Sequence, residues 1–149
     1  MKTKYVLGFL FDELDIHKLL LIRKKRPEWQ AGKCNGVGGH IEPYETPDEA
    51  MRRECREETS LDVSSWQEFG SLSGEKFKIH LFVGQAKLEN STQTTDEEVE
   101  IFGVFRSLRE LCNQQIILPN LVWLVPLAWN YLFKQGGCLY LEMKEKSID

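Results

Sequence analysis

The 149-residue sequence predicts an α/β fold in which a mixed, largely antiparallel central sheet carries one helix on each face. Three observations support this fold class. Short apolar runs separated by turn residues are typical of strands. One acidic segment and one apolar segment each have the residue spacing of a helix. The length, and the lack of repeats or low-complexity linkers in the sequence, predict a single domain over residues 1–149.

The N-terminal third predicts a hairpin. Residues 5–11 form an apolar run, residues 12–15 supply turn-forming acids, and residues 18–24 form the partner strand. The following segment, 27–33, reads as a loop that contains Trp29.

Further strands are expected after the acidic segment, which begins at about residue 47. Residues 66–73 and 76–87 read as two strands joined at Ser73 and Gly74. The later elements expected are a strand at 99–105, a short helix at 108–111 and an edge strand at 138–143.

The two longer helices have clear start signals. Thr46 is placed to cap the first, with Pro47 at its first helical position and Glu49 completing a capping box, so the helix should begin at about Pro47. The second should begin near Asn120 and contains Pro126, where a kink is expected. Its core-facing residues are expected to be 121, 124, 125, 128 and 132.

The acidic helix carries the first functional indication. Glu54, Glu57 and Glu58 stand at i, i+3 and i+4, which places three mutually repelling carboxylates on one face. A bound cation or full solvation makes this tolerable, and oxygen ligands suit Mg²⁺ or Mn²⁺. Arg53 can reach back to Glu45 and fix the preceding loop against the helix without using the metal ligands. A merely solvated surface helix is the alternative.

The spacing of these residues resembles a known signature. Gly39, five residues, Glu45, seven residues and then residues 53–61 are similar to the Nudix hydrolase box, G-x5-E-x7-R-E-aliphatic-x-E-E-x-G-aliphatic. Cys55 replaces an aliphatic residue, which a buried thiol can do. Ser60 replaces the glycine that ends the helix, and a left-handed backbone at that position would strain serine by on the order of 1 kcal/mol.

The resemblance implies an α/β/α sandwich and hydrolysis of a nucleoside diphosphate linked to another group. It assigns metal binding to the Gly39 carbonyl and to carboxylates of the box, with a further glutamate from a later loop. Either Glu54 or Glu57 would be the base, because spacing alone does not separate a metal ligand from a proton acceptor. The implied metal ligands are Gly39, Glu54, Glu57, Glu58 and Glu97, with Glu98 the second choice for the last, and the implied catalytic group is Glu54, Glu57, Arg53 and Glu45.

A second, more diffuse resemblance concerns the substrate. Residues 35–42, 123–126 and 133–137 look like the Nudix branch that hydrolyses oxidised purine nucleoside triphosphates, such as 8-oxo-dGTP, to monophosphate and pyrophosphate. That branch usually has lysine at the position of His40 and a pair of acids near Asn120. The alternatives are another dNTP, a nucleotide sugar, ADP-ribose, or a nucleotide-sensing domain without catalysis.

The substrate-binding candidates come from three kinds of group. Glycine backbone permits close approach of a ligand, basic residues at a strand end suit phosphates, and side-chain amides suit a purine edge. The candidates are Gly38, Gly39, Lys24, Arg23, Asn35 and Asn120. The alternatives are structural roles without ligand binding: a turn dipeptide at Asn35, a helix N-cap at Asn120, and solvation of a strand end for the basic residues.

The composition limits the classes of partner that the chain is expected to bind. A net charge of −4 argues against a polymeric nucleic acid and leaves a small nucleotide with its metal. The four cysteines show no C-x-x-C spacing, so reduced thiols, a cytoplasmic location and no zinc are expected. No apolar run reaches the ~20 residues of a membrane helix, so no membrane partner is expected. The chain is expected to be a monomer or a homodimer.

Overall fold

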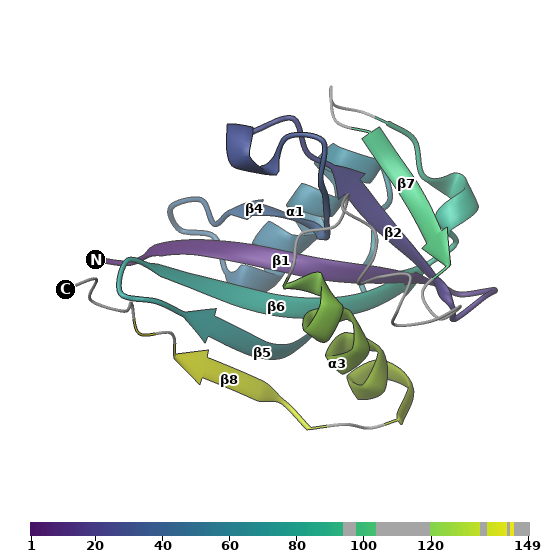
Figure 1. The fold of residues 1–149 in the computed structure, drawn as a ribbon. Coiled ribbons are helices and arrows are strands. Elements are labelled where there is room, and N and C mark those ends of the chain that lie inside the picture. Colours follow the sequence, from purple (N-terminus) through teal and green to yellow (C-terminus); the bar gives the residue numbers. More distant parts are fainter. Residues whose placement is uncertain (94–97, 104–119, 135–136, 143, 145–149) are drawn as a thin grey trace.

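The computed structural model describes residues 1–93, 98–103, 120–134, 137–142 and 144. In these residues eight strands form one sheet, in the order β3-β2-β1-β6-β5-β8, with β4 paired to β1 and β7 to β2 (Figure 1). The strands are β1 (Thr3–Asp12), β2 (Lys18–Arg23), β3 (Cys34–Asn35), β4 (Val37–His40), β5 (Gln67–Ser73), β6 (Phe77–Ala86), β7 (Glu98–Gly103) and β8 (Leu139–Glu142).

Strand β1 organises the sheet. It pairs antiparallel with β2 and β4 and parallel with β6 along its whole length. The predicted hairpin is confirmed, with Leu10 opposite Leu20. The sheet is mixed as expected, because β5 also pairs parallel with β8, while β5–β6 and β2–β7 are antiparallel.

Strands β3 and β4 were not expected, since the segment 35–39 reads as a glycine turn. Instead, Gly38 lies opposite Leu7 of β1. A Cβ at Gly38 would lie 2.1 Å from the carbonyl oxygen of Val6, so glycine is needed for the backbone of β1 to approach. Glycine at this position thus serves the pairing of β4 with β1.

Helices α1 (Pro47–Thr59) and α3 (Leu121–Lys134) pack on opposite faces of the sheet, as predicted. Figure 1 shows α3 in front of the sheet and α1 behind it. Each helix belongs to its own core cluster, because successive strand residues point to opposite faces. The α1 cluster includes Leu10, Leu20, Ile22, Met51, Cys55 and Phe82, and the α3 cluster includes Phe9, Phe11, Leu19, Leu81, Leu121 and Leu124.

Both ends of α1 follow the sequence signals. Thr46 caps the helix and forms the complete capping box with Glu49, so the helix begins at Pro47 as predicted. Ser60 ends it in the left-handed conformation, with φ 59°. Its hydroxyl also pairs with the hydroxyl of Thr92. Cys55 fills the core beneath the helix, and burial raises the pKa of its thiol to about 11.

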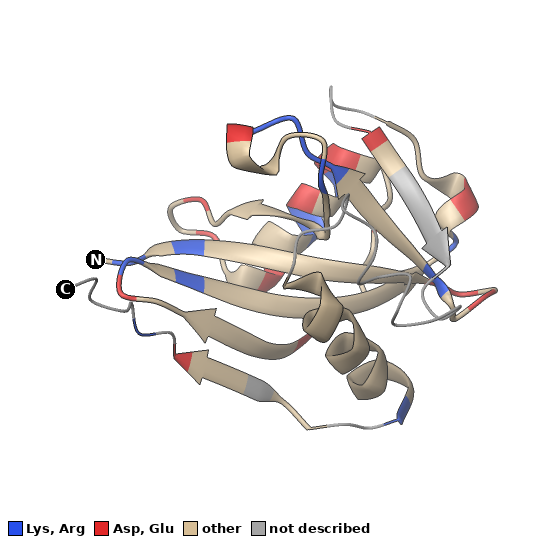
Figure 2. Ribbon diagram, in the orientation of Figure 1, with Lys and Arg blue, Asp and Glu red and all other residues tan. Residues whose placement is uncertain are grey.

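Helix α3 is uncharged along most of its length (Figure 2). Leu121, Leu124, Val125 and Ala128 are buried against the sheet, as the apolar spacing predicted. Pro126 lies inside the helix. In the part of the chain described, no helix is long and apolar enough to cross a membrane. The expected helix at 108–111 lies outside the described residues.

Small elements in the connections complete the described chain. A short 3-10 helix at Glu28–Gln30 holds Trp29, which is largely exposed, and a second lies at Leu88–Asn90. Strand β8 confirms the expected edge strand. The cysteines among the described residues, Cys34, Cys55 and Cys138, are free thiols, and Cys112 lies outside those residues.

Candidate active site

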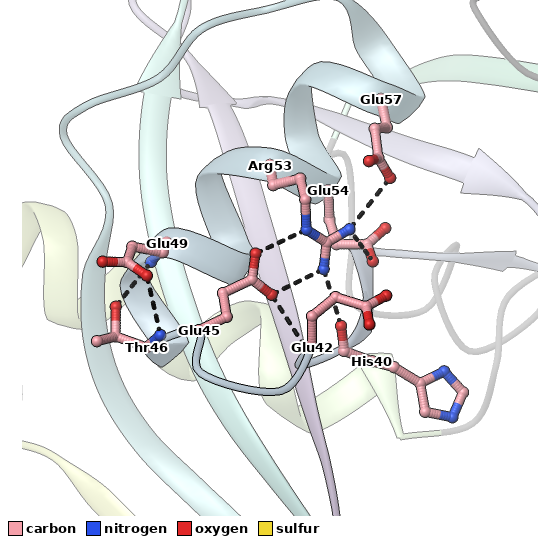
Figure 3. Close-up of polar contacts among 8 residues, drawn as sticks. All are labelled: His40, Glu42, Glu45, Thr46, Glu49, Arg53, Glu54 and Glu57. Carbon is pink, nitrogen blue, oxygen red and sulfur yellow. Dashed lines mark hydrogen bonds and ion pairs between the residues drawn. The ribbon is translucent and has the colours of Figure 1, made fainter.

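Arg53 is the centre of the polar network on α1 (Figure 3). Its Nε donates to Glu45 Oε2 at 2.7 Å, and its Nη2 donates to Glu45 Oε1 at 2.9 Å. The predicted ion pair between this helix and its preceding loop is therefore confirmed. Glu45 Oε1 also accepts from the backbone N–H of Glu42 at 3.0 Å, which closes the loop on itself.

The same arginine reaches two further carboxylates, contrary to the expectation that it would leave the metal ligands unused. Its Nη1 donates to Glu54 Oε1 at 2.9 Å and to Glu57 Oε2 at 3.2 Å. The other N–H of Nη2 donates to the carbonyl oxygen of His40 at 3.0 Å. All five guanidinium N–H groups are thus engaged, because a planar fork can meet several acceptors at once.

Glu54 is held close to strand β4. Its side chain is 15% exposed. A Cβ at Gly39 would lie 2.4 Å from Glu54 Oε1, so only glycine allows the carboxylate to lie against the strand here.

Glu57 and Glu58 point in different directions. The Glu57 side chain is 56% exposed, whereas Glu58 is buried and its Oε1 accepts from the backbone N–H of Gly38 at 2.9 Å. The expectation of three carboxylates gathered on one face is therefore only partly met. In the described residues no three His, Cys, Asp or Glu side chains cluster closely enough to hold a metal ion.

The charges of the network shift the proton affinities of its members. Hydrogen bonding from Arg53 holds the pKa of Glu45 below its ordinary value, and Glu45 in turn raises the pKa of Arg53. Burial raises the pKa of Glu54, against the opposing effect of Arg53, and nearby Glu57 and Glu45 add to the rise. Glu54 is therefore a better proton acceptor than an ordinary glutamate.

The donor set fits a divalent cation in its chemistry. Glu54 and Glu57 both contact one cationic group, Arg53 Nη1, so these two carboxylates already converge on a positive charge. Carboxylate oxygens, and a backbone carbonyl such as that of Gly39, are the ligands that Mg²⁺ and Mn²⁺ prefer.

The two candidate amides have local roles. Asn35 Oδ1 accepts from the N–H of Gly36 at 2.8 Å, and the Asn120 carbonyl accepts from Leu124 at the start of α3. Asn35 pairs with Ile22, whose side chain belongs to the α1 core cluster, while α3 packs on the opposite face. Asn35 lies in strand β3 and not in a turn, and these contacts do not bring the two amides together.

Arg23 ends β2, which pairs with β7, and Lys24 follows it in the chain. Arg23 Nη1 donates to the Gly32 carbonyl at 2.8 Å, and Arg23 forms a long ion pair with Glu98 at 3.9 Å. Lys24 holds the same loop through backbone hydrogen bonds. Glu97, the preferred loop ligand, lies outside the described residues.

Sequence reasoning missed two backbone groups and one side chain. The His40 carbonyl and the Gly38 N–H hold Arg53 and Glu58 in place, yet backbone atoms leave no signal in residue type. Tyr44 has a positive φ of 68° and is fully exposed in the loop before α1. Its place between Pro43 and Glu45 marks a turn, but the sequence does not reveal its backbone conformation.

Two curated relatives match part of the chain. A Danio rerio protein named oxidized purine nucleoside triphosphate hydrolase is 38% identical over 71 residues, covering 48% of this chain and 41% of the relative. The Mus musculus protein of the same name is 33% identical over 92 residues, covering 58% of this chain and 57% of the relative. The matched region thus spans about half the length of these relatives.

Solved structures share the fold. A NUDIX-family hydrolase from Clostridium perfringens superposes with a TM-score of 0.69 at 20% identity, covering 89% of this chain and 99% of that one. The NUDIX domain of Shewanella oneidensis NrtR, solved in complex with ADP ribose, has a TM-score of 0.70 at 15% identity and covers 89% of each chain.

The family comparison covers strands β1 to β7 and the carboxylate network. The NUDIX domain matches residues 1–121, a range that holds β1, β4 and the whole of α1. The arrangement of Arg53, Glu45 and Glu54 therefore lies inside the matched region. On this match, the chain belongs to the NUDIX domain family.

Proposed function

We propose that this chain hydrolyses a nucleoside triphosphate to the monophosphate and pyrophosphate, with Mg²⁺, or alternatively Mn²⁺, as cofactor. The preferred substrate is an oxidised purine deoxynucleotide such as 8-oxo-dGTP. The names of the two curated relatives support this substrate class. We further propose that residues 1–149 act as one domain on a small nucleotide, without polymeric nucleic acid.

The observation that carries the proposal is the convergence of Glu54 and Glu57 on Arg53 Nη1 beside Gly39. Glu54, Glu57 and the Gly39 carbonyl would hold the metal. When bound, the metal neutralises phosphate charge and acidifies a water molecule. Glu97 is retained as a candidate ligand, and it directly precedes β7 in the chain.

The residues of the chain have distinct tasks in this proposal. Glu45 orients Arg53, which in turn fixes the positions of Glu54 and Glu57. Either Glu54 or Glu57, whichever does not bind the metal, accepts the proton of the attacking water. Glu58 does not face the same point, and it holds the strand that carries Gly39 through the Gly38 N–H.

Substrate binding follows from the groups beside this centre. The hydrogen bond of Asn35 uses its side-chain carbonyl, so its amide NH₂ can donate to a purine edge. Lys24 is proposed to meet phosphates, and Arg23 to act mainly through the loop that it holds. Asn120 is proposed as a weaker contributor, because it begins a helix on the other face of the sheet.

The test is product release across a nucleotide panel, measured with Mg²⁺ and with excess chelator. The panel holds 8-oxo-dGTP, dGTP, dCTP, ADP-ribose and UDP-glucose. The proposal expects monophosphate and pyrophosphate in equal amounts from 8-oxo-dGTP, at the highest kcat/KM of the panel, with no release under chelation. Faster cleavage of ADP-ribose or UDP-glucose would reassign the substrate, and no cleavage of any member would contradict the proposal.

A further inference from the structure

The loop between β2 and β3, residues 24–33, concentrates the positive charge of the chain, and we call it the basic loop. It holds four of the 19 lysines and arginines and one of the 23 acids, so the rest of the chain has a net charge of −7. Figure 2 shows this loop projecting beyond the end of β2, with its basic positions in blue. The molecule thus presents one cationic loop on an otherwise acidic chain.

Hydrogen bonds give the basic loop a defined structure. Its ends are joined where the N–H of Lys24 donates to the Lys33 carbonyl and the N–H of Gly32 donates to the Lys24 carbonyl, both at 2.8 Å. Arg23 Nη1 donates to the same Gly32 at its carbonyl oxygen, also at 2.8 Å. Between these ends lies the 3-10 helix Glu28–Gln30. The side chains at the tip are therefore presented together by a structured loop.

A tryptophan stands among these charges. Trp29 is 67% exposed, whereas Trp66 in the core is 8% exposed, and Lys25 and Arg26 beside it in the loop are exposed as well. A single exposed apolar residue is ordinary on a protein surface. The combination with clustered basic residues is more specific, because an indole ring settles at the level of lipid headgroups while lysine and arginine attract anionic lipids.

Three kinds of partner carry the negative charge that this loop attracts: an anionic bilayer, a single-stranded nucleic acid and an acidic protein segment. A nucleic acid strand is bound along a basic groove in which several aromatic rings stack on successive bases. The basic loop instead offers one tryptophan on a projecting structure, and the charge of −7 on the rest of the chain repels a polyanion that lies along it. A flat anionic surface touches the loop alone and therefore fits this charge distribution best.

We infer that the basic loop is a docking surface for a bilayer that contains anionic lipid. Trp29 enters the headgroup layer, and Lys25 and Arg26 meet the lipid phosphates. Such contact needs no membrane-spanning helix, because attachment at the surface of a bilayer uses only exposed apolar and basic side chains. The attachment is reversible and sensitive to salt, because a few cations supply most of the attraction.

Vesicle sedimentation tests this docking. The protein is mixed at low salt with vesicles of phosphatidylcholine, either alone or with phosphatidylglycerol as roughly one third of the lipid. The partition coefficient should be at least about 10-fold higher for the anionic vesicles, and the difference should vanish at about 0.5 M salt. The double variant Lys25→Gln/Arg26→Gln should bind the anionic vesicles at least about 10-fold more weakly. Trp29→Ala should weaken the same binding by about 5-fold or more.

Matched controls remove the same groups elsewhere. Lys76→Gln/Lys87→Gln deletes two exposed lysines outside the loop, and Trp123→Ala deletes an exposed tryptophan of α3. Both controls should keep vesicle binding, and urea midpoints verify that every variant is folded. Equal binding to the two kinds of vesicle, or equal losses in the loop variants and the controls, would overturn the inference. Binding of a thymidine oligonucleotide or of polyglutamate without vesicle binding would overturn it as well, in favour of a polymeric partner.

Discussion

Arg53 shows how one residue can organise a site whose other charged side chains are carboxylates. Its guanidinium takes the position of a cation between Glu54 and Glu57 while it holds Glu45 with two hydrogen bonds. The pair with Glu45 was predictable from the seven-residue spacing. The contacts to the other two carboxylates were not, because helical spacing leaves open which rotamer each side chain adopts.

Replacing Arg53 by lysine should reveal this geometry. Lysine has three donors on a single nitrogen and cannot serve five acceptors in a plane. Arg53→Lys is expected to lower the free energy of unfolding by about 1–3 kcal/mol, because partly buried acceptors lose their donors. Urea unfolding measures this loss of stability. Arg52→Lys is the control, since its bidentate pair with Asp62 is exposed, and a loss of more than about 1 kcal/mol there would show that burial is not the cause.

Glu45 should make stability depend on acid pH. Its folded pKa lies below the ordinary value of 4.5, so its ionised form stabilises the fold. This contribution is complete above the unfolded pKa and is lost as pH falls through the folded pKa. Between about pH 5 and pH 3 the free energy of unfolding should fall more steeply for the unaltered protein than for the Glu45→Gln variant. Urea titrations at fixed ionic strength measure both curves. Parallel curves would show that Glu45 contributes nothing.

At the scale of elements, helix α1 was predictable and strand β4 was not. The capping box and Pro47 are local signals, so the sequence alone placed the start of the helix. Strand β4 depends on its pairing with β1, about thirty residues earlier, and its glycines have low strand propensity. Tertiary pairing overrides propensity here, and the backbone groups that hold Arg53 and Glu58 come from this unpredicted strand.

The junction of α1 with the segment after β6 carries a prediction about stability. The sequence suggests that Ser60→Gly stabilises the protein, because glycine relieves the left-handed backbone. The structure adds an opposing effect, since the serine hydroxyl pairs with Thr92. Ser60→Gly alone should therefore change stability by less than about 0.5 kcal/mol. In a Thr92→Ala background the same substitution should be about 0.5–1 kcal/mol more favourable. Equal effects in both backgrounds would show that the hydroxyl pair is not stabilising.

For the whole molecule, the apolar runs of the strands and the start signals and apolar spacing of the helices predicted two helices on opposite faces of one mixed sheet. The sheet divides the core into two clusters, and α1 rests on one of them. The direction of each carboxylate could not be predicted. The Glu58 side chain is held by a backbone N–H in β4, whereas the Glu57 side chain extends toward solvent. The proposed catalytic centre is thus a property of the assembled fold.

The most direct test of this account is pyrophosphate release from 8-oxo-dGTP, at saturating Mg²⁺, by the unaltered protein and by Glu57→Gln. The substitution keeps the side-chain volume but removes one of the two carboxylates proposed to hold the metal. Because Glu57 is exposed, thermal unfolding should be little changed. Glu75→Gln, which removes an equal charge from an exposed turn far along the chain, is the matched control. The account predicts that Glu57→Gln lowers kcat by at least about 10²-fold, while the control keeps near-normal turnover. Near-normal turnover in a folded Glu57→Gln protein would contradict it.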